Sequence, residues 1–430
     1  MPRGLWVTLK NNQAMTFPDR SSANFPNPML YRRFGRTELS MPVFSCGGMR
    51  YQFQWQDVPF AQVPKDNQDN LQSTIERSLE LGINHIETAR GYGTSEMQLG
   101  KVLPRLPRET LIVQTKVSPK DDPKEFRREF DKSLGYLNLD YVDLLGIHGI
   151  NNRETLEQSL RPGGCLDVCR QLQREGRVRF VGFSTHGPTA IITEAINSGE
   201  FDYVNLHWYY IFQDNWPAIA AATAQDMGVF IISPSDKGGQ LYNPPEKLMH
   251  LCQPLSPMVF NNLFCLSHPQ VHTLSIGASR PTDFDEHLKT LPYLASDQET
   301  KKVLQPILAK LHGAMVEALG EDWVTSWRIG LPSPEHTPGE INIPKILWLY
   351  NLCQSFDLVE YSKMRYNLLG SGGHWFPGQP ANNIDQAKLW QCLAQSPNRE
   401  KVLDILQQTD QMLKGETVQR LSRQEVAKTS

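Results

Sequence analysis

The sequence predicts an α/β protein: a (β/α)8 TIM barrel followed by a mostly helical C-terminal domain. From about residue 40, short β-branched or apolar runs alternate with amphipathic segments whose apolar residues recur every three or four positions. Eight such repeats fit into roughly 250 residues, which is the usual size of a (β/α)8 barrel. After about residue 295 the alternation stops and helical patterns follow.

The eight expected strands are short and apolar, and they cover residues 41–48, 83–88, 111–116, 141–148, 178–184, 201–208, 228–234 and 271–277. A doubly wound open sheet is the alternative, but it usually carries a phosphate-binding G-x-G-x-x-G after its first strand. The nearest match, residues 91–96, follows the second strand and lacks the last glycine. We therefore favour the barrel, with residues 31–42 as a small hairpin that caps its floor.

Three units are expected along the chain: an irregular arm at 1–30, the barrel at 31–294 and the helical domain at 295–430. The C-terminal helical patterns are interrupted by two loops, and the second contains an aromatic, glycine-rich stretch at 372–379. We expect this stretch to be a structural loop, with a contribution to the active site as the alternative.

Composition and charge exclude several classes of protein. The 430 residues carry a net charge of −3, and 40% are hydrophobic and 21% charged, which suits a soluble globular protein and predicts neither a nucleic-acid nor a membrane partner. The N-terminus lacks the apolar stretch of a signal peptide, so a cytoplasmic location is expected. The 7 cysteines are scattered and odd in number, which indicates reduced thiols rather than a disulfide framework.

Polar residues stand at three consecutive strand ends, where a barrel of this kind places its active site. They are Glu87 and Tyr92 after the second strand, Lys116 at the third and His148 at the fourth. Each alone has an ordinary explanation, such as a rim charge or a core histidine. Together they could protonate a carbonyl oxygen: the lysine lowers the phenol's pKa, the carboxylate keeps the lysine charged, and the histidine hydrogen-bonds the oxygen. No side chain donates hydride, so a nicotinamide cofactor is implied.

Residues 31–291 resemble the aldo-keto reductase superfamily in stretches such as GINHIETARGYGTSEMQLGKVL, LIVQTKVSP, LDYVDLLGIHG and VRFVGFSTHG. The resemblance implies that Tyr92 is the general acid, that Lys116 tunes its pKa and that His148 orients the carbonyl. The family's aspartate corresponds to Glu87, which is one methylene longer. This departure puts rate and substrate scope in doubt more than reaction type.

The resemblance also implies a cofactor site. The contacts to the nicotinamide carboxamide fall on Ser184, on Thr185 (where the family has an asparagine) and on Asn205, and Ser233 follows the seventh strand. The family's stacking aromatic is replaced by Ile232.

The phosphate-binding region corresponds to residues 276–288, where the expected cofactor contacts are Gly277, Ala278, Ser279, Arg280 and Glu286. Arg280 is the expected partner of a 2′-phosphate, because a planar guanidinium suits phosphate. Asp283 is acidic where relatives often carry a basic residue nearby. NADPH is the expected cofactor, with NADH as the alternative.

The C-terminal part resembles the ferredoxin-like tail of one branch of this family. That tail carries C-x2-C-x2-C-x3-C-P, whereas this chain has Trp327, Gly330, Ser333 and Thr337 at the same spacing, and Cys392 alone remains of the second motif. Thiolates hold iron–sulfur clusters, so none is expected.

The prediction is an NAD(P)H-dependent oxidoreductase that reduces an aldehyde, ketone or quinone, with oligomeric state left open. The alternative is a catalytically weak, cofactor-binding module with a redox-sensing or partner-binding role. A metal-dependent barrel hydrolase would need several metal ligands at the strand ends, and His148 beside a lysine argues against it.

Overall fold

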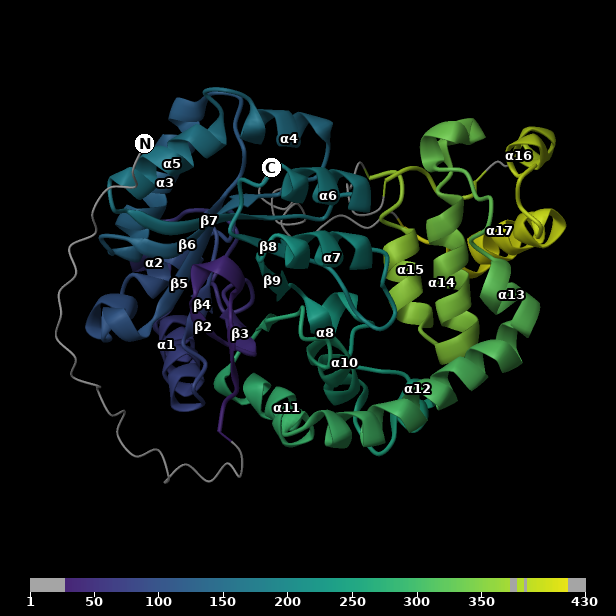
Figure 1. The fold of residues 1–430 in the computed structure, drawn as a ribbon, viewed down its shortest axis with the longest axis horizontal. Coiled ribbons are helices and arrows are strands. Elements are labelled where there is room, and N and C mark those ends of the chain that lie inside the picture. The colour runs from purple at the N-terminus through teal and green to yellow at the C-terminus, as the bar shows by residue number, and fades with distance from the viewer. Residues whose placement is uncertain (1–27, 372–376, 383–384, 417–430) are drawn as a thin grey trace.

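The computed structural model describes residues 28–371, 377–382 and 385–416. Most of the expected arm at 1–30 and the aromatic part of the 372–379 stretch lie outside these residues. The described chain forms a barrel joined to a helical C-terminal part, and α12 (Asp297–Leu319) runs from one to the other (Figure 1). None of the described helices is both long and apolar enough to cross a membrane.

Eight parallel strands close the barrel in chain order, with the last paired to the first. They are β3 (Phe44–Gly47), β4 (His85–Glu87), β5 (Ile112–Val117), β6 (Val142–His148), β7 (Val178–Ser184), β8 (Tyr203–Leu206), β9 (Gly228–Ile231) and β10 (Thr273–Ile276). Every expected strand overlaps one of them, and only β5 runs past its expected range, by one residue, so the predicted (β/α)8 architecture is confirmed.

An antiparallel hairpin covers the amino-terminal end of the barrel, as predicted for residues 31–42. It consists of β1 (Tyr31–Arg33) and β2 (Ser40–Pro42). Phe34, fully buried, packs against Tyr203 at the start of β8, with the ring centroids 5.8 Å apart. Gly228 at the start of β9 leaves room for this ring, because a Cβ there would lie only 2.6 Å from it. The hairpin therefore closes the floor and leaves the opposite end open.

Helices connect the strands on the outside of the barrel. They are α1 (Lys65–Glu80), α2 (Ser95–Leu99), α3 (Pro123–Leu137), α4 (Arg153–Leu160), α5 (Cys165–Arg174), α6 (Thr189–Asn197), α7 (Trp216–Ala224), α8 (Pro234–Lys237), α9 (Glu246–Cys252), α10 (Pro257–Leu266) and α11 (Phe284–Leu288). Their starts show the expected chemistry: Asp122 caps α3 by accepting from the Lys124 amide, and Asn152 forms a capping box with Thr155 at α4.

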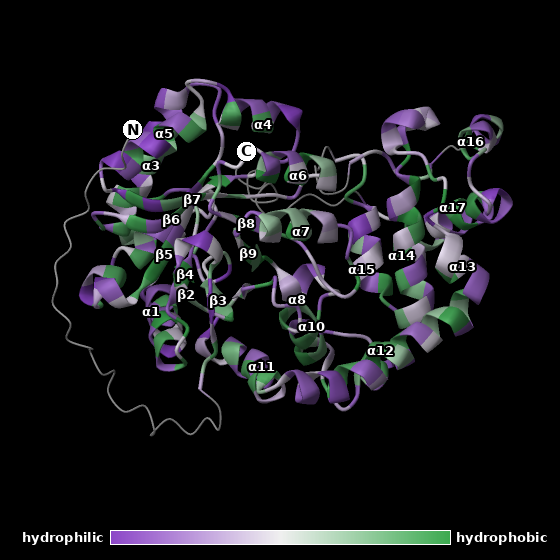
Figure 2. Cartoon of the chain, viewed as in Figure 1, coloured by the Kyte–Doolittle hydropathy of each residue, from purple (hydrophilic) through white to green (hydrophobic). Residues whose placement is uncertain are grey.

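The C-terminal part consists of α12, α13 (Glu321–Ser326), α14 (Ile343–Phe356), α15 (Val359–Tyr366), α16 (Gln386–Cys392) and α17 (Arg399–Leu413). Hydrophilic and hydrophobic residues alternate along α12, as expected of a helix that buries one face (Figure 2). Gly330 has a φ of 67° and lies against the Gln395 carbonyl, which a Cβ would approach to 2.1 Å. The two segments that resemble cluster-binding loops are thus packed together through backbone.

The C-terminal helices dock on loops at the open end of the barrel. The Trp348 indole N–H donates to the Ile211 carbonyl at 2.7 Å, beyond β8. The Tyr361 hydroxyl donates to the Lys237 carbonyl at 2.8 Å, beyond β9. This placement brings α15 to the mouth where the candidate active site lies.

Candidate active site

One cavity of about 1350 Å³ opens at the carboxyl ends of the strands. It is lined by all four candidate catalytic residues: Glu87, Tyr92, Lys116 and His148. The barrel topology brings them together, because β4, β5 and β6 are neighbours and each ends at this mouth. The proximity that the sequence predicted is therefore present.

Glycines on neighbouring strands make room for the central pair of side chains. Lys116 is in register with Gly146 on β6, where a Cβ would lie 2.9 Å from the lysine Cγ. Glu87 is in register with Gly47 on β3, where a Cβ would lie 3.3 Å from the carboxylate. Larger residues at either glycine would displace the ion pair.

Glu87, Lys116 and Tyr92 form a contiguous polar group. The Lys116 ammonium contacts the Glu87 carboxylate and donates to the Thr88 carbonyl at 2.8 Å. The Tyr92 hydroxyl donates to Glu87 Oε1 across 3.5 Å, and its ring centroid lies 4.9 Å from the lysine nitrogen. The His148 ring meets the Tyr92 ring edge to face at 5.7 Å.

Burial dominates the ionisation of this group. It raises the pKa of the Tyr92 phenol, because a phenolate would lose its hydration there. The direction is opposite to the lowering that we expected from Lys116, and the effect of Lys116 on the phenol stays a prediction. Burial also lowers the pKa of Lys116 well below its usual range, and the contacting Glu87 carboxylate opposes that shift. Tyr92 is thus a neutral phenol at pH 7, the form that can give a proton.

Ser184 and Asn205 fit the carboxamide of a nicotinamide. They are adjacent in register on β7 and β8, and both are buried. Within the described part of the chain, neither the Ser184 hydroxyl nor either polar atom of the Asn205 amide has a hydrogen-bond partner. Buried polar atoms normally are paired, and a carboxamide offers both a donor and an acceptor.

Thr185 is arranged differently from this pair. Its hydroxyl donates to the Ile150 carbonyl at 2.7 Å and accepts from the Gly187 amide at 3.0 Å. The side chain is buried and does not line the cavity. Its hydroxyl is thus used to hold the loop after β7.

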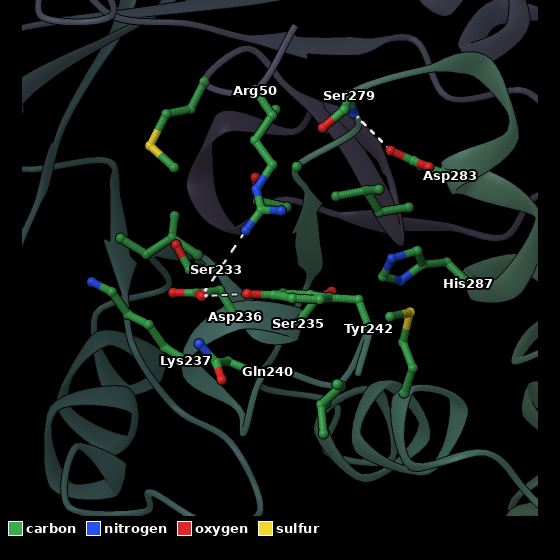
Figure 3. A pocket seen from close by; sticks show the side chains of 18 of the residues that line it. Arg50, Ser233, Ser235, Asp236, Lys237, Gln240, Tyr242, Ser279, Asp283 and His287 are labelled. Carbon is green, nitrogen blue, oxygen red and sulfur yellow. Dashed lines mark hydrogen bonds and ion pairs between the residues drawn. The ribbon is translucent and has the colours of Figure 1, made fainter. Parts of the chain in front are cut away.

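Residues 233–242, which we call the strap, cross the cavity after β9. Ser233 begins the strap with a left-handed φ of 54° and lines the cavity. Asp236 faces Arg50, which comes from the loop after β3, at 4.0 Å, and it accepts from the Tyr242 hydroxyl at 3.2 Å (Figure 3). Arg365 of α15 donates to the same carboxylate at 2.8 Å.

The predicted phosphate region is occupied by an acidic side chain. Asp283 accepts from the Ser279 amide at 2.8 Å and from the Arg280 guanidinium at 3.0 Å. Arg280 is otherwise exposed, and Gly277 and Ser279 lie at the cavity while Ala278 is buried.

Glu286, the last of the predicted cofactor contacts, also lines the cavity. It accepts from the Ser256 hydroxyl at 2.5 Å and pairs with Lys289 at 2.6 Å.

Several cavity-lining residues were not predicted from the sequence, namely Arg50, His186, Lys237, Met364, Arg365 and Leu368. The prediction rested on strand ends, whereas these residues lie in loops, at the end of α8, or on and just after α15. The sequence could have indicated Lys237, because it is a cation only four residues beyond Ser233, a predicted cofactor contact. Nothing local marks the residues of α15, since their position depends on docking.

Comparisons with known proteins agree with this fold. Residues 45–243 match the family model described as Aldo/keto reductase family. The chain is 27% identical over 279 residues to L-galactose dehydrogenase of Arabidopsis thaliana, which covers 56% of this chain and 85% of the relative. It is 28% identical over 200 residues to NADH-specific methylglyoxal reductase of Escherichia coli (strain K12), covering 40% and 56%. The holo form of an aldo-keto reductase from Bacillus halodurans shares the fold, with a TM-score of 0.54 at 20% identity, covering 66% of this chain and 96% of that one.

Fold and comparisons together define an NAD(P)H-dependent oxidoreductase that acts on a small molecule. By these comparisons, residues 45–243 resemble the aldo-keto reductase family. Among the described residues, no group of three or more His, Cys, Asp or Glu side chains could hold a metal ion.

Proposed function

We propose that the chain reduces the carbonyl group of an aldehyde, ketone or quinone, with Tyr92 as the general acid. The observation that carries this proposal is the neutral Tyr92 phenol, which contacts the Glu87 carboxylate, beside Lys116 and opposite His148 in one cavity. When bound, the nicotinamide supplies a hydride to the carbonyl carbon. Tyr92 gives its proton to the carbonyl oxygen, and His148 orients that oxygen by a hydrogen bond.

Lys116 and Glu87 act on Tyr92. As negative charge develops on the phenol oxygen, the nearby ammonium stabilises it. The Glu87 carboxylate holds the ammonium in place, and the Thr88 carbonyl fixes its direction. Glu87 is one methylene longer than the family's aspartate, so we propose a substrate class and not a particular carbonyl compound.

In the proposed cofactor site, the carboxamide lies against Ser184 and Asn205. Ser233, at the start of the strap, contacts the cofactor as well, and the adenosine end lies near residues 277–280 and Glu286. NADPH is supported by Arg280, and NADH by Asp283, whose carboxylate would repel a 2′-phosphate. We retain NADPH as the proposal and NADH as the alternative. No iron–sulfur cluster is proposed.

A cofactor-binding module of weak activity is the second candidate. Two observations favour it: Glu87 replaces a shorter carboxylate, and the Thr185 hydroxyl is engaged with backbone instead of facing the cavity.

Steady-state oxidation of NADPH and NADH with aldehydes, ketones and quinones tests the proposal. Tyr92→Phe should lower kcat by about 100-fold or more, the usual contribution of a positioned acid. Tyr350→Phe, which removes a hydroxyl from the C-terminal helices, is the matched control. Equal turnover by Tyr92→Phe would refute the role of the phenol, and cofactor binding without any turnover would favour the second candidate.

A further inference from the structure

A second polar cluster lies in the cavity wall, apart from the candidate catalytic residues. The Lys237 ammonium is 3.1 Å from His186 Nδ1 and 3.1 Å from His207 Nε2, and these two imidazole nitrogens are 2.5 Å apart. Lys237 and His186 line the cavity and are half-buried, whereas His207 is buried behind them. The cluster therefore presents an ammonium and an imidazole to whatever occupies the cavity.

The barrel register explains how the two histidines meet. His186 stands two residues beyond Ser184, and His207 stands two residues beyond Asn205, in the segments that follow β7 and β8. Ser184 and Asn205 are paired in register. Both histidines therefore lie just beyond the pair that fits the carboxamide, toward the open mouth.

Hydrogen bonds hold the cluster in place. The Tyr209 hydroxyl donates to the Ile232 carbonyl, so it accepts from His207 Nδ1 at 2.5 Å. A neutral His207 then has an accepting Nε2, which faces the Lys237 ammonium. The Tyr361 hydroxyl of α15 holds the Lys237 backbone by donating to its carbonyl at 2.8 Å.

The carboxylates that line the cavity are each in contact with a different cation. The pairs are Glu87 with Lys116, Asp236 with Arg365, Asp283 with Arg280, and Glu286 with Lys289. Lys237 differs from these cations in that its ammonium contacts two imidazoles. A cation flanked by imidazole groups suits the oxygens of a carboxylate or phosphate.

We infer that Lys237 and His186 form a subsite for an anionic oxygen group, and that this group is a carboxylate on the carbonyl substrate. The inference rests on the proposed carbonyl reduction. The diphosphate of the cofactor is the other possible source of such oxygens. Lys237 lies on the side of the pocket opposite Ser279 and Asp283, near which the adenosine end of the cofactor is proposed (Figure 3). The substrate is therefore the favoured source.

Two nearly isosteric aldehydes test the subsite: 4-carboxybenzaldehyde and 4-formylbenzamide. The wild-type protein should prefer the acid by about tenfold or more in kcat/KM, the scale of one charge-assisted hydrogen bond. Lys237→Met should bring the acid-to-amide ratio close to one, and Lys237→Arg should retain part of the preference. Lys302→Met, which removes an exposed lysine from α12, is the matched control and should keep the wild-type ratio.

Binding is measured in parallel, so that the subsite and the proposed function can fail separately. Calorimetry of the protein saturated with NADPH gives, without turnover, the ratio of dissociation constants for 4-(hydroxymethyl)benzoate and 4-(hydroxymethyl)benzamide, of which only the first carries a carboxylate. Acid-selective binding that depends on Lys237 but leads to no reduction would overturn the proposed function alone. A weaker affinity for NADPH in Lys237→Met, with the acid preference intact, would assign the anion to the cofactor and overturn the inference. Acid-to-amide ratios that stay at the wild-type values in Lys237→Met would also overturn the inference. If Lys237→Met does not fold, the same outcome in His186→Gln would overturn it.

Discussion

The ion pair between Arg365 and Asp236 should couple the C-terminal helices to the strap, and its strength can be worked out from its burial. The guanidinium is 2.8 Å from the carboxylate, and the two side chains are 7% and 27% exposed. Burial alone would raise the pKa of Asp236, but Arg365 and the other surrounding cations lower it below its usual value. The carboxylate is therefore ionised at neutral pH and needs its partner.

Removing Arg365 should cost about 2 kcal/mol of unfolding free energy. Exposed pairs contribute about 0.2–1 kcal/mol, and breaking a fully buried pair costs about 3–5 kcal/mol. This pair lies between those limits, because the aspartate keeps some contact with water and Arg50 at 4.0 Å. Arg365→Met keeps most of the aliphatic stem, so lost packing adds little.

A double-mutant cycle with Asp236→Asn separates the pair from other effects, using urea unfolding followed by tryptophan fluorescence. We expect a coupling energy of about 1–2 kcal/mol, together with faster amide hydrogen exchange in residues 233–242. Arg328→Met is the matched control, since its pair with Asp214 also joins the C-terminal part to the barrel but is 52% and 34% exposed. A coupling below about 0.5 kcal/mol, or strap exchange equal to wild type, would refute the anchoring of the strap by α15.

Three further predictions concern ionisable groups. Glu87→Gln should lower kcat/KM for reduction by about tenfold or more, because a neutral amide holds the Lys116 ammonium less strongly than a carboxylate does. Glu87→Asp keeps the charge and should lose less activity. Equal losses in the two variants would argue against a role for the negative charge of Glu87. Burial lowers the pKa of His85 to about 3, so the unfolded chain takes up a proton below pH 6.5 that the folded chain refuses. His85 alone should therefore make the free energy of unfolding, from urea titration, fall by up to about 1.4 kcal/mol per pH unit between pH 6 and pH 4, and His85→Gln should remove that part of the slope. Asp283→Asn should raise the affinity for NADPH relative to NADH by about fivefold or more in fluorescence titrations, because it removes a negative charge beside Arg280. An unchanged ratio of the two affinities would place the 2′-phosphate elsewhere.

The barrel was predictable because its strands are short, apolar and regularly spaced, and because parallel strands of that number close in one way. The four candidate catalytic residues could be grouped for the same reason, as strand ends converge. The pKa of Tyr92 could not be predicted, since it depends on how deeply the cavity buries the phenol. The engagement of Ser279 and Arg280 by Asp283 depends on local loop geometry, and the contribution of Arg365 depends on docking between distant segments. The domain boundary at 294/295 stays a prediction.

The anchoring of the strap by α15 also has a consequence for biosynthesis. β10 ends at Ile276, so every barrel strand leaves the ribosome before Tyr361 and Arg365, which hold the strap, have been made. We expect a nascent chain to acquire its barrel first and its finished mouth only near the end of translation. A chain ended at residue 294 should then show barrel-like protection from proteolysis outside residues 233–242 and cleavage within them. Protection of the strap in such a chain would show that the mouth matures without the tail.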